Sequence, residues 1–92
     1  MVEFIEVHLT VDAPDKASRL AHGLLHAGLA ATVDISEVTR LIRREGGIEE
    51  TSAWQLGVVT TAGRLADIER HVGDDHPDEE ILIVTMPISR LD

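Results

Sequence analysis

Cysteine is absent from this sequence of 92 residues, and tyrosine is absent as well. Without a thiol the chain can form no disulfide, no thiolate nucleophile and no cysteine-ligated zinc or iron–sulfur site. Its aromatic residues are one phenylalanine and one tryptophan. The sequence therefore predicts an aliphatic core, because Val, Ile, Leu and Ala supply nearly all of its apolar side chains.

Basic residues are scarce: eight Lys and Arg stand against 17 Asp and Glu, which gives a formal net charge of −9. This balance argues against binding to nucleic acid or to an anionic membrane, since phosphates need cationic side chains to displace their counterions. It permits cationic partners, metal ions among them, and it also keeps a small protein soluble. No apolar run approaches the ~20 residues that span a bilayer, so we expect no membrane insertion.

The first four residues, Met1 to Phe4, contain neither the basic nor the apolar segment of a secretory signal. We therefore expect a cytoplasmic protein. A chain of 92 residues has room for one domain, so residues 1–92 are assigned to a single domain. A domain this short buries roughly 60–65% of its unfolded surface, and association with copies of itself is a common means of stabilising it.

The first half of the chain predicts a strand, a helix and a second strand. Apolar alternation favours the first strand at residues 4–11, and Asp12 followed by Pro14 is typical of a helix start, with Asp12 as the cap. Gly28 is expected to end this helix. The apolar positions of the next strand, residues 29–43, change parity part-way, which predicts a bulge.

The second half predicts a hairpin turn, a return strand, a second helix and a last strand. The paired glycines Gly46 and Gly47 indicate a tight turn at residues 45–48, and the return strand covers residues 50–60. A threonine at 60–61 would cap a second helix that ends at Gly73. The continuous apolar run of residues 81–87 indicates a strand buried on both faces.

The order strand, helix, strand, strand, helix, strand is that of two interleaved β-α-β units. The expected fold is therefore α+β and ferredoxin-like: one antiparallel βαββαβ sheet with both helices on one face. Ile, Leu and Val occupy both parities in several strands, so the second face of the sheet is expected to be apolar as well. Self-association is the simplest way to cover such a face.

Five short segments, taken in order, resemble segments of a known family. They are Leu29–Asp34, Ile42–Glu49, Val59–Thr61, His76–Glu79 and Met86–Ile88. In order and spacing the chain is similar, over nearly its whole length, to the CutA-type divalent-cation tolerance family. The resemblance implies a PII-like homotrimer packed through extended hairpins, with a loose association with copper and other divalent cations.

The sequence departs from the family pattern at several positions. Thr32 stands where the family has cysteine, and Ile42 and Arg44 stand where its hairpin has tyrosine and tryptophan. Val59 replaces a lysine, and Asp78 replaces a tyrosine. These differences leave the expected trimer unchanged and weigh against a metal or ligand site like that of other family members.

The segment from Asp74 to Glu80, called the acidic link below, places imidazole and carboxylate donors close together. Such donors suit Cu²⁺, Zn²⁺ or Mn²⁺. The predicted metal ligands are His71, Asp75, His76 and Glu79, with His76 as the first choice. The alternative is a solvated loop, in which His76 does no more than shape the turn.

Two further histidine arrangements have both a metal-binding and an ordinary interpretation. His22 and His26 are one helical turn apart and would share the exposed face of the first helix, where two imidazoles can chelate a metal. Ordinary exposed histidines are the alternative. His8 shares a strand face with Glu6, where a hydrogen-bonded histidine is the main expectation and a pH-sensitive subunit contact the second.

Arg40, Arg43 and Arg44 form the one basic cluster of the sequence, beside the hairpin turn. They predict protection of an exposed hairpin against edge aggregation, together with salt bridges across the oligomer. Glu49 and Glu50 are their expected partners across the hairpin.

No motif supplies a nucleophile or an acid–base pair in a protected cleft, so we expect no catalytic activity. The expected function is divalent-cation tolerance by a homotrimer that would bind copper, zinc or another divalent ion. The alternative is a PII-like sensing or regulatory trimer that binds a small ligand between subunits. The acidic charge and the missing phosphate loop weigh against nucleotides as that ligand. A third possibility is a structural trimer that serves as a platform for a partner protein.

Overall fold

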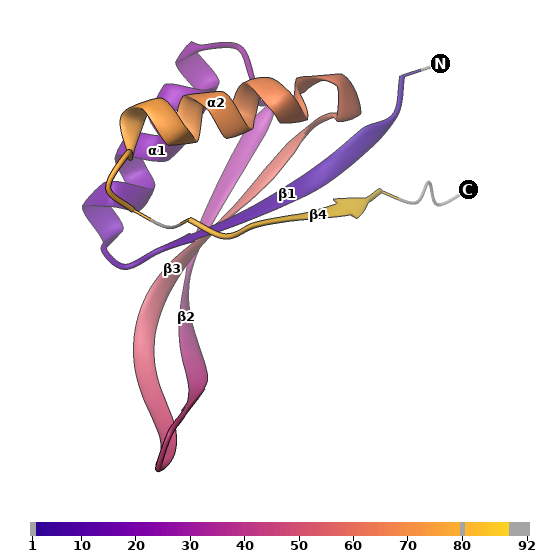
Figure 1. The fold of residues 1–92 in the computed structure, drawn as a ribbon. Helices are drawn as coiled ribbons and strands as arrows, with labels where there is room; N and C mark the ends of the chain where they lie inside the picture. Colours follow the sequence, from indigo (N-terminus) through magenta and orange to yellow (C-terminus); the bar gives the residue numbers. More distant parts are fainter. Residues whose placement is uncertain (1, 80, 89–92) are drawn as a thin grey trace.

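The computed structural model describes residues 2–79 and 81–88. Four strands and two helices follow one another in the predicted order (Figure 1). Their bounds are β1 Phe4–Val11, α1 Pro14–His26, β2 Thr32–Arg44, β3 Gly47–Thr61, a 3₁₀ turn at Ala62–Arg64, α2 Leu65–Asp75 and β4 Ile83–Pro87. None of the described helices is long and apolar enough to cross a membrane.

The four strands form one antiparallel sheet in the order β2-β3-β1-β4, which confirms the predicted ferredoxin-like fold. Both helices cover one face of this sheet (Figure 1). β1 ends where Val11 pairs with Trp54, whereas β2 and β3 continue beyond that point. Residues 38–53, called the protruding hairpin below, therefore extend from the body and lengthen the molecule to 49 Å.

The hairpin turns at Glu45 and Gly46, as predicted. Gly46 and Gly47 have φ angles of 91° and 153°, which a side chain would strain. The predicted bulge is wrong, because β2 and β3 pair without interruption from one end of β2 to the other. Apolar residues occupy both parities here because the helices do not cover the protruding hairpin, so neither face is singled out for burial.

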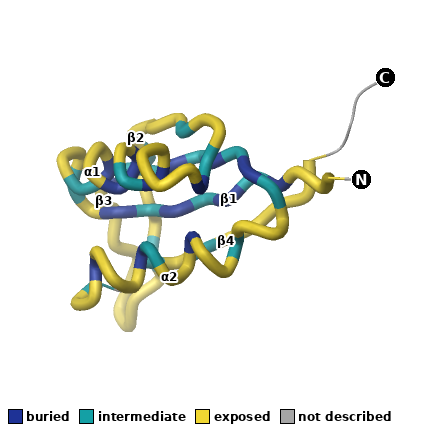
Figure 2. Tube along the Cα trace, turned by 90° about the horizontal axis from the view of Figure 1, so that it is seen from above, coloured by how far each residue is buried: buried dark blue, intermediate teal, exposed yellow. Residues whose placement is uncertain are grey.

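The core lies between the sheet and the helices and is aliphatic, as predicted. Figure 2 shows buried positions along β1 alternating with partly exposed ones. The buried cluster consists of Ile5, Val7, Leu9, Val11, Ala17, Leu20, Ala21, Leu24, Leu29, Leu56, Val58, Ile68 and Val72. Trp54 packs against this cluster. Each fully buried Leu, Ile or Val stabilises the fold by about 1.5–3 kcal/mol.

Helix α1 begins at Pro14, as predicted, but the capping of both helices differs from the prediction. Asp12 does not cap α1: Ala13 is the N-cap residue, and the Asp12 carboxylate lies 2.9 Å from the Lys16 ammonium instead. No side chain caps α2. Thr60 lies in β3, and its hydroxyl donates to the Leu29 carbonyl at 2.6 Å. The side chains of Asp12 and Thr60 thus contact other polar groups instead of a helix end. Thr61 is the N-cap residue of the 3₁₀ turn before α2, but its side chain makes no capping hydrogen bond.

The two helices also end differently from one another. Gly28, with φ 70°, follows α1 as predicted. α2 does not end at Gly73 but continues to Asp75. Gly73 has no positive φ, so it costs some helix propensity without ending the helix. The helix ends where Pro77 approaches, because the residue before a proline disfavours helical geometry.

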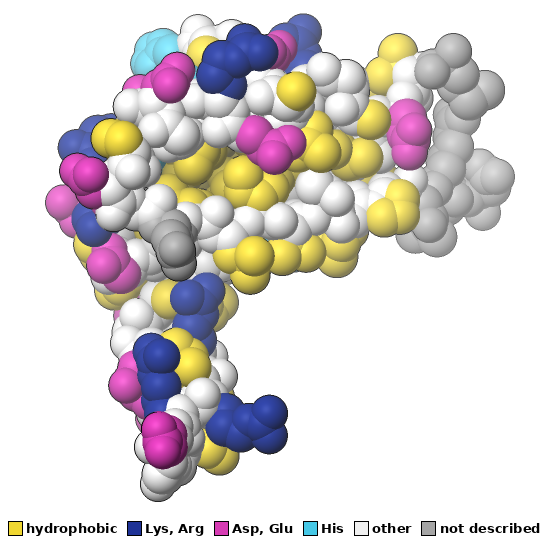
Figure 3. All heavy atoms as spheres, viewed as in Figure 1, with side chains coloured by type: hydrophobic (Ala, Val, Ile, Leu, Met, Phe, Trp, Pro, Cys, Tyr) yellow, Lys and Arg dark blue, Asp and Glu magenta, His cyan; other side chains and the backbone are white. Residues whose placement is uncertain are grey.

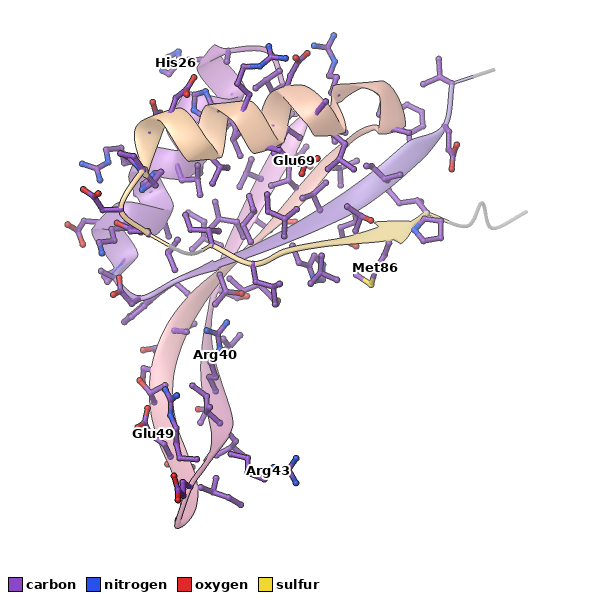
Figure 4. The ribbon with its side chains drawn as sticks, in the orientation of Figure 1. His26, Arg40, Arg43, Glu49, Glu69 and Met86 are labelled. Carbon is purple, nitrogen blue, oxygen red and sulfur yellow. The ribbon has the colours of Figure 1, made fainter. Side chains whose placement is uncertain are left out.

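The face of the sheet opposite the helices, called the open face below, carries both polar and apolar side chains. Glu6 and His8 of β1 lie there beside Met86 and Val84 of β4. In Figure 4 the Met86 side chain points away from the helices. Phe4 of β1 shares this face and is exposed, and Val59 of β3 is opposite Glu6. The expected apolar second face is therefore confirmed in part, with polar side chains among the apolar ones.

Strand β4 is an edge strand and is not buried on both faces, which corrects the prediction. Ile81 and Ile83 pack against the core, whereas Leu82, Val84 and Met86 are exposed. Figure 3 shows hydrophobic side chains along this edge and in the hollow between it and α2. A continuous apolar sequence indicates a strand with apolar side chains on both faces. In this chain the core buries only one face of β4.

Candidate functional site

The end of α2 carries two of the four predicted metal ligands. Because the helix continues to Asp75, His71 and Asp75 lie one turn apart on it, with His71 Nε2 at 3.1 Å from Asp75 Oδ2. These atoms are close enough for an ion pair but are not aligned as a hydrogen bond. The His71 ring lies against α1 at Gly23, where a Cβ would be 2.8 Å from Nε2. Glycine at this position therefore leaves room for the ring between the helices.

His76 follows α2 directly and is 4% exposed. Its backbone N–H donates to the Val72 carbonyl at 2.9 Å, which holds the residue against the end of the helix. Neither of its ring nitrogens has a hydrogen-bond partner among the described residues. Glu79 Oε2 lies 3.7 Å from Nδ1, which is too far for a hydrogen bond. Buried polar atoms nearly always have a partner, so this imidazole is an exception that needs an explanation.

Glu79 connects His76 to helix α1. Its Oε1 atom lies 3.1 Å from Lys16 Nζ, and Lys16 in turn lies 2.9 Å from Asp12 Oδ1. Hydrogen bonds to Asp12 and then to Glu79 raise the pKa of Lys16 above its ordinary 10.5. The same lysine lowers the pKa of Asp12 below its ordinary 3.8. The acidic link is thus tied to the start of α1 by charge.

The four predicted ligands form two pairs, His71 with Asp75 and His76 with Glu79. Within residues 2–79 and 81–88, no three His, Asp or Glu side chains gather closely enough to hold a metal ion as they stand. Glu80, the last residue of the acidic link, lies outside the described residues. Each pair offers one imidazole and one carboxylate, a combination that Cu²⁺ and Zn²⁺ accept.

A cleft of about 350 Å³ lies where the protruding hairpin meets the body. It is lined by Thr10, Val11, Asp12, Arg40, Ile42, Thr51, Ser52, Ala53, Asp78, Glu79 and Ile81. Charges of both signs and several hydroxyl groups therefore surround it. Sequence reasoning missed this cleft because its walls come from three segments that are far apart in the chain. Asp12, placed directly after a strand, was the one available signal, and it was interpreted as a helix cap.

The arginine cluster separates in the structure (Figure 4). Arg40 lines the cleft, and Arg43 points away from the protruding hairpin. Arg44 Nη2 lies 3.6 Å from Glu49 Oε1 on the opposite strand, which confirms one of the two expected partners. Glu50 is paired opposite Leu41.

The remaining histidines lie where the sequence places them. His8 Nε2 is 3.2 Å from Glu6 Oε1 on the open face, so the expected same-face partner is confirmed. His22 and His26 are both exposed on α1.

The sequence matches the family model of the CutA1 divalent ion tolerance protein over residues 5–92. A solved structure of CutA1 from Oryza sativa has a TM-score of 0.87 and 25% identity, and the match covers 99% of this chain and 84% of that chain. The divalent cation tolerance protein from Thermus thermophilus has a TM-score of 0.81 and 30% identity, with coverage of 100% and 88%. The periplasmic divalent cation tolerance protein CutA from Archaeoglobus fulgidus has a TM-score of 0.81 and 30% identity, with coverage of 98% and 86%. A comparison with curated protein sequences finds no match.

Proposed function

The chain belongs to the CutA1 divalent ion tolerance family, and from this premise we propose that it is a non-enzymatic homotrimer that binds a divalent cation. The proposed ligands are His76 and Glu79 of the acidic link, joined by His71 and Asp75 at the end of α2 when the two pairs move together. Cu²⁺ is favoured and Zn²⁺ follows, because nitrogen and oxygen donors bind Cu²⁺ most strongly among the first-row divalent ions.

The unpaired ring of His76 is the observation that carries the cation site. Both of its nitrogens are buried without a hydrogen-bond partner among the described residues. An ion bonded to Nδ1 and to Glu79 Oε2 would give both atoms a partner. Metal–nitrogen and metal–oxygen bonds of about 2.0–2.2 Å allow two ligand atoms of one ion to be up to about 4 Å apart, and these two are 3.7 Å apart.

Exposed apolar side chains on two elements support the trimer. Isolated two-stranded hairpins are marginally stable in water, and the protruding hairpin has no helix packed on it. Leu41 and Ile48 are 64% and 74% exposed there, and they are diagonal neighbours across the strands. Val84 and Met86 add apolar surface on the open face. Packing against further copies of the chain would cover both regions.

Calorimetric titration of the chelator-stripped protein with Cu²⁺, then Zn²⁺, tests the cation site. Saturable binding at a fixed ratio per chain is expected, and His76→Ala and Glu79→Gln should each weaken it at least tenfold. Glu79→Gln is informative even if the buried His76→Ala variant folds poorly. Asp74→Asn is the matched control, because it removes an exposed carboxylate of the same link. Equal affinity in wild type and Glu79→Gln would contradict the proposal.

The cleft favours a second candidate, a PII-like trimer that senses a small ligand. Arg40 and the carboxylates of Asp12 and Glu79 line the same space, and this mixture suits a small ligand that carries both an anionic and a cationic group. A thermal-shift screen of such compounds, with Arg40→Gln as the comparison, tests it. A rise in melting temperature that the variant lacks would support the sensing function; equal shifts in both proteins would contradict it.

A further inference from the structure

Helix α1 carries two histidines that take no part in the contacts described above. His22 and His26 are one turn apart, and their ring centroids are 6.5 Å apart with the ring planes inclined by 28°. Both side chains are exposed. In Figure 4 His26 lies at the outer side of α1, away from the sheet. The two imidazoles thus share one solvent-facing stretch of the helix.

The hydrogen bond of His22 assigns the proton on its ring. Nδ1 lies 2.7 Å from the Ser18 carbonyl oxygen, with the Ser18 hydroxyl further off at 3.5 Å. A carbonyl oxygen can only accept, so Nδ1 is the donor and carries the hydrogen in the neutral ring. The lone pair is then on Nε2, which is free to bind a metal. A backbone carbonyl that orients the second nitrogen in this way is typical of metal-ligating histidines.

His22 and His26 differ from the other three histidines in their surroundings. His8, His71 and His76 each lie within 4 Å of a carboxylate oxygen. Within residues 2–79 and 81–88, neither His22 nor His26 lies that close to a carboxylate. Two imidazoles without an acidic partner favour ions that prefer nitrogen, which are Cu²⁺, Ni²⁺ and Zn²⁺, over Mg²⁺, Ca²⁺ and Mn²⁺, which prefer oxygen.

We propose that His22 and His26 form a second cation site, a surface chelate for Cu²⁺ that also accepts Ni²⁺ and Zn²⁺. One nitrogen from each ring binds the ion, and water fills the other positions. The rings must come closer than 6.5 Å for both nitrogens to lie about 2 Å from one ion. Rotation of the exposed His26 side chain closes this gap, while the backbone hydrogen bond keeps His22 in place. This site does not depend on the acidic link.

Copper titration followed by electron paramagnetic resonance tests the second site. The wild type should show a Cu²⁺ signal with nitrogen ligation. In His26→Asn this signal should be weaker, and the apparent dissociation constant of the site should be at least tenfold higher. The double variant His26→Ala/Ala27→His keeps the number of histidines but moves one imidazole by about 100° around the helix. It should lose the site in the same way, with an unchanged circular dichroism spectrum.

Glu79→Gln separates the two sites. If both proposals hold, Glu79→Gln retains the Cu²⁺ resonance signal of the His22 and His26 site, and His26→Asn retains binding at the acidic link. Loss of all binding in Glu79→Gln, with none lost in His26→Asn, would overturn the α1 site and leave the link site standing. Unchanged nitrogen ligation and affinity in His26→Ala/Ala27→His would also overturn the α1 site. Copper binding by separate exposed histidines would not depend on the spacing between them.

Discussion

The chemistry of the acidic link depends most on Glu79. One carboxylate oxygen lies 3.1 Å from the Lys16 ammonium, and the other lies 3.7 Å from the unpaired ring of His76. Lys16 therefore competes with any cation for the same carboxylate. The strength of a cation site here depends on how much of the Glu79 charge the lysine already neutralises.

Replacing Lys16 should strengthen the proposed cation site. In Lys16→Met we expect the affinity for Cu²⁺ at the proposed link site to rise by about two- to fivefold, because the charge competing for Glu79 is removed. The partial exposure of the two side chains keeps the effect modest. Isothermal titration of both proteins measures the change. Arg64→Met removes the same charge at the opposite end of α2 and should leave the affinity unchanged. A weaker site in Lys16→Met would show that the lysine supports binding.

The pKa of Asp12 predicts how stability depends on pH. Lys16 lowers the pKa of Asp12 in the folded protein below 3.8, so this contact stabilises the fold above that pH and is lost as the pH falls through the lower folded value. The pKa of Lys16 is raised above 10.5, so its contribution holds below 10.5 and is lost as the pH rises through the higher folded value. Asp12→Asn should therefore melt at a slightly lower temperature than wild type at pH 7, and the two should converge toward pH 2.

The control for this pH profile is Asp15→Asn, which removes an exposed carboxylate from the first turn of α1. Thermal melts of the three proteins between pH 2 and pH 8 make the comparison. A difference between wild type and Asp12→Asn that stays constant down to pH 2 would contradict the ion-pair explanation.

At the scale of elements, the contact between α1 and α2 places His71. A Cβ at Gly23 would lie 2.8 Å from His71 Nε2 and 3.7 Å from Asp75 Oδ2. Gly23→Ala therefore displaces the ring and lengthens the contact between His71 and Asp75. Alanine gains up to about 1 kcal/mol of helix propensity over glycine, which offsets the displacement of a side-chain end.

We therefore expect Gly23→Ala to change the free energy of unfolding by less than about 1 kcal/mol while it weakens Cu²⁺ binding at the acidic link severalfold. Chemical denaturation and titration calorimetry measure the two quantities. Gly73→Ala is the matched control, since its added Cβ would have no atom of another part of the described chain within 4 Å. It should stabilise α2 without changing the affinity. Equal binding in Gly23→Ala and wild type would exclude His71 as a ligand.

The sequence predicted the elements but not the local competition at their ends. The order of strands and helices along the chain follows from the periodicity of the apolar residues, and the turn at Gly46 follows from the backbone freedom of glycine. Both are local properties of the sequence. Asp12 and a threonine at 60–61 are predicted to cap helices, but Asp12 and Thr60 each contact another polar group, and Thr61 makes no capping hydrogen bond. Gly73 was expected to end α2, although its backbone remains helical. That error placed Asp75 in a loop when it lies on the same helix as His71.

At the scale of the whole molecule, the cleft could not be predicted because it exists only where β1, the protruding hairpin and the acidic link meet. The open face is predicted to be apolar, and it is so only in part: Phe4, Val84 and Met86 are exposed there, beside the polar Glu6 and His8. Pairwise geometry such as the 3.7 Å between His76 and Glu79 also lies beyond sequence patterns. The sequence indicates which side chains could bind a cation. Only the structure shows which of these side chains lie close enough to bind the same ion.

Assembly should depend on the apolar side chains of the protruding hairpin. In Leu41→Asp we expect loss of the proposed trimer at micromolar concentration, because a charge replaces a side chain that another copy would cover. Sedimentation equilibrium measures the mass. Leu25→Asp, a change at an exposed leucine on α1, should remain trimeric. A trimeric Leu41→Asp would exclude this residue from the subunit contact.

Native mass spectrometry of the chelator-stripped protein, titrated with Cu²⁺ beside Glu79→Gln, tests the proposed homotrimer and its cation site together. We predict a trimer that takes up cations in steps up to a fixed number per chain, and a Glu79→Gln trimer that binds one fewer ion per chain. A wild-type monomer, or a trimer whose copper uptake is the same in Glu79→Gln, would contradict the proposal.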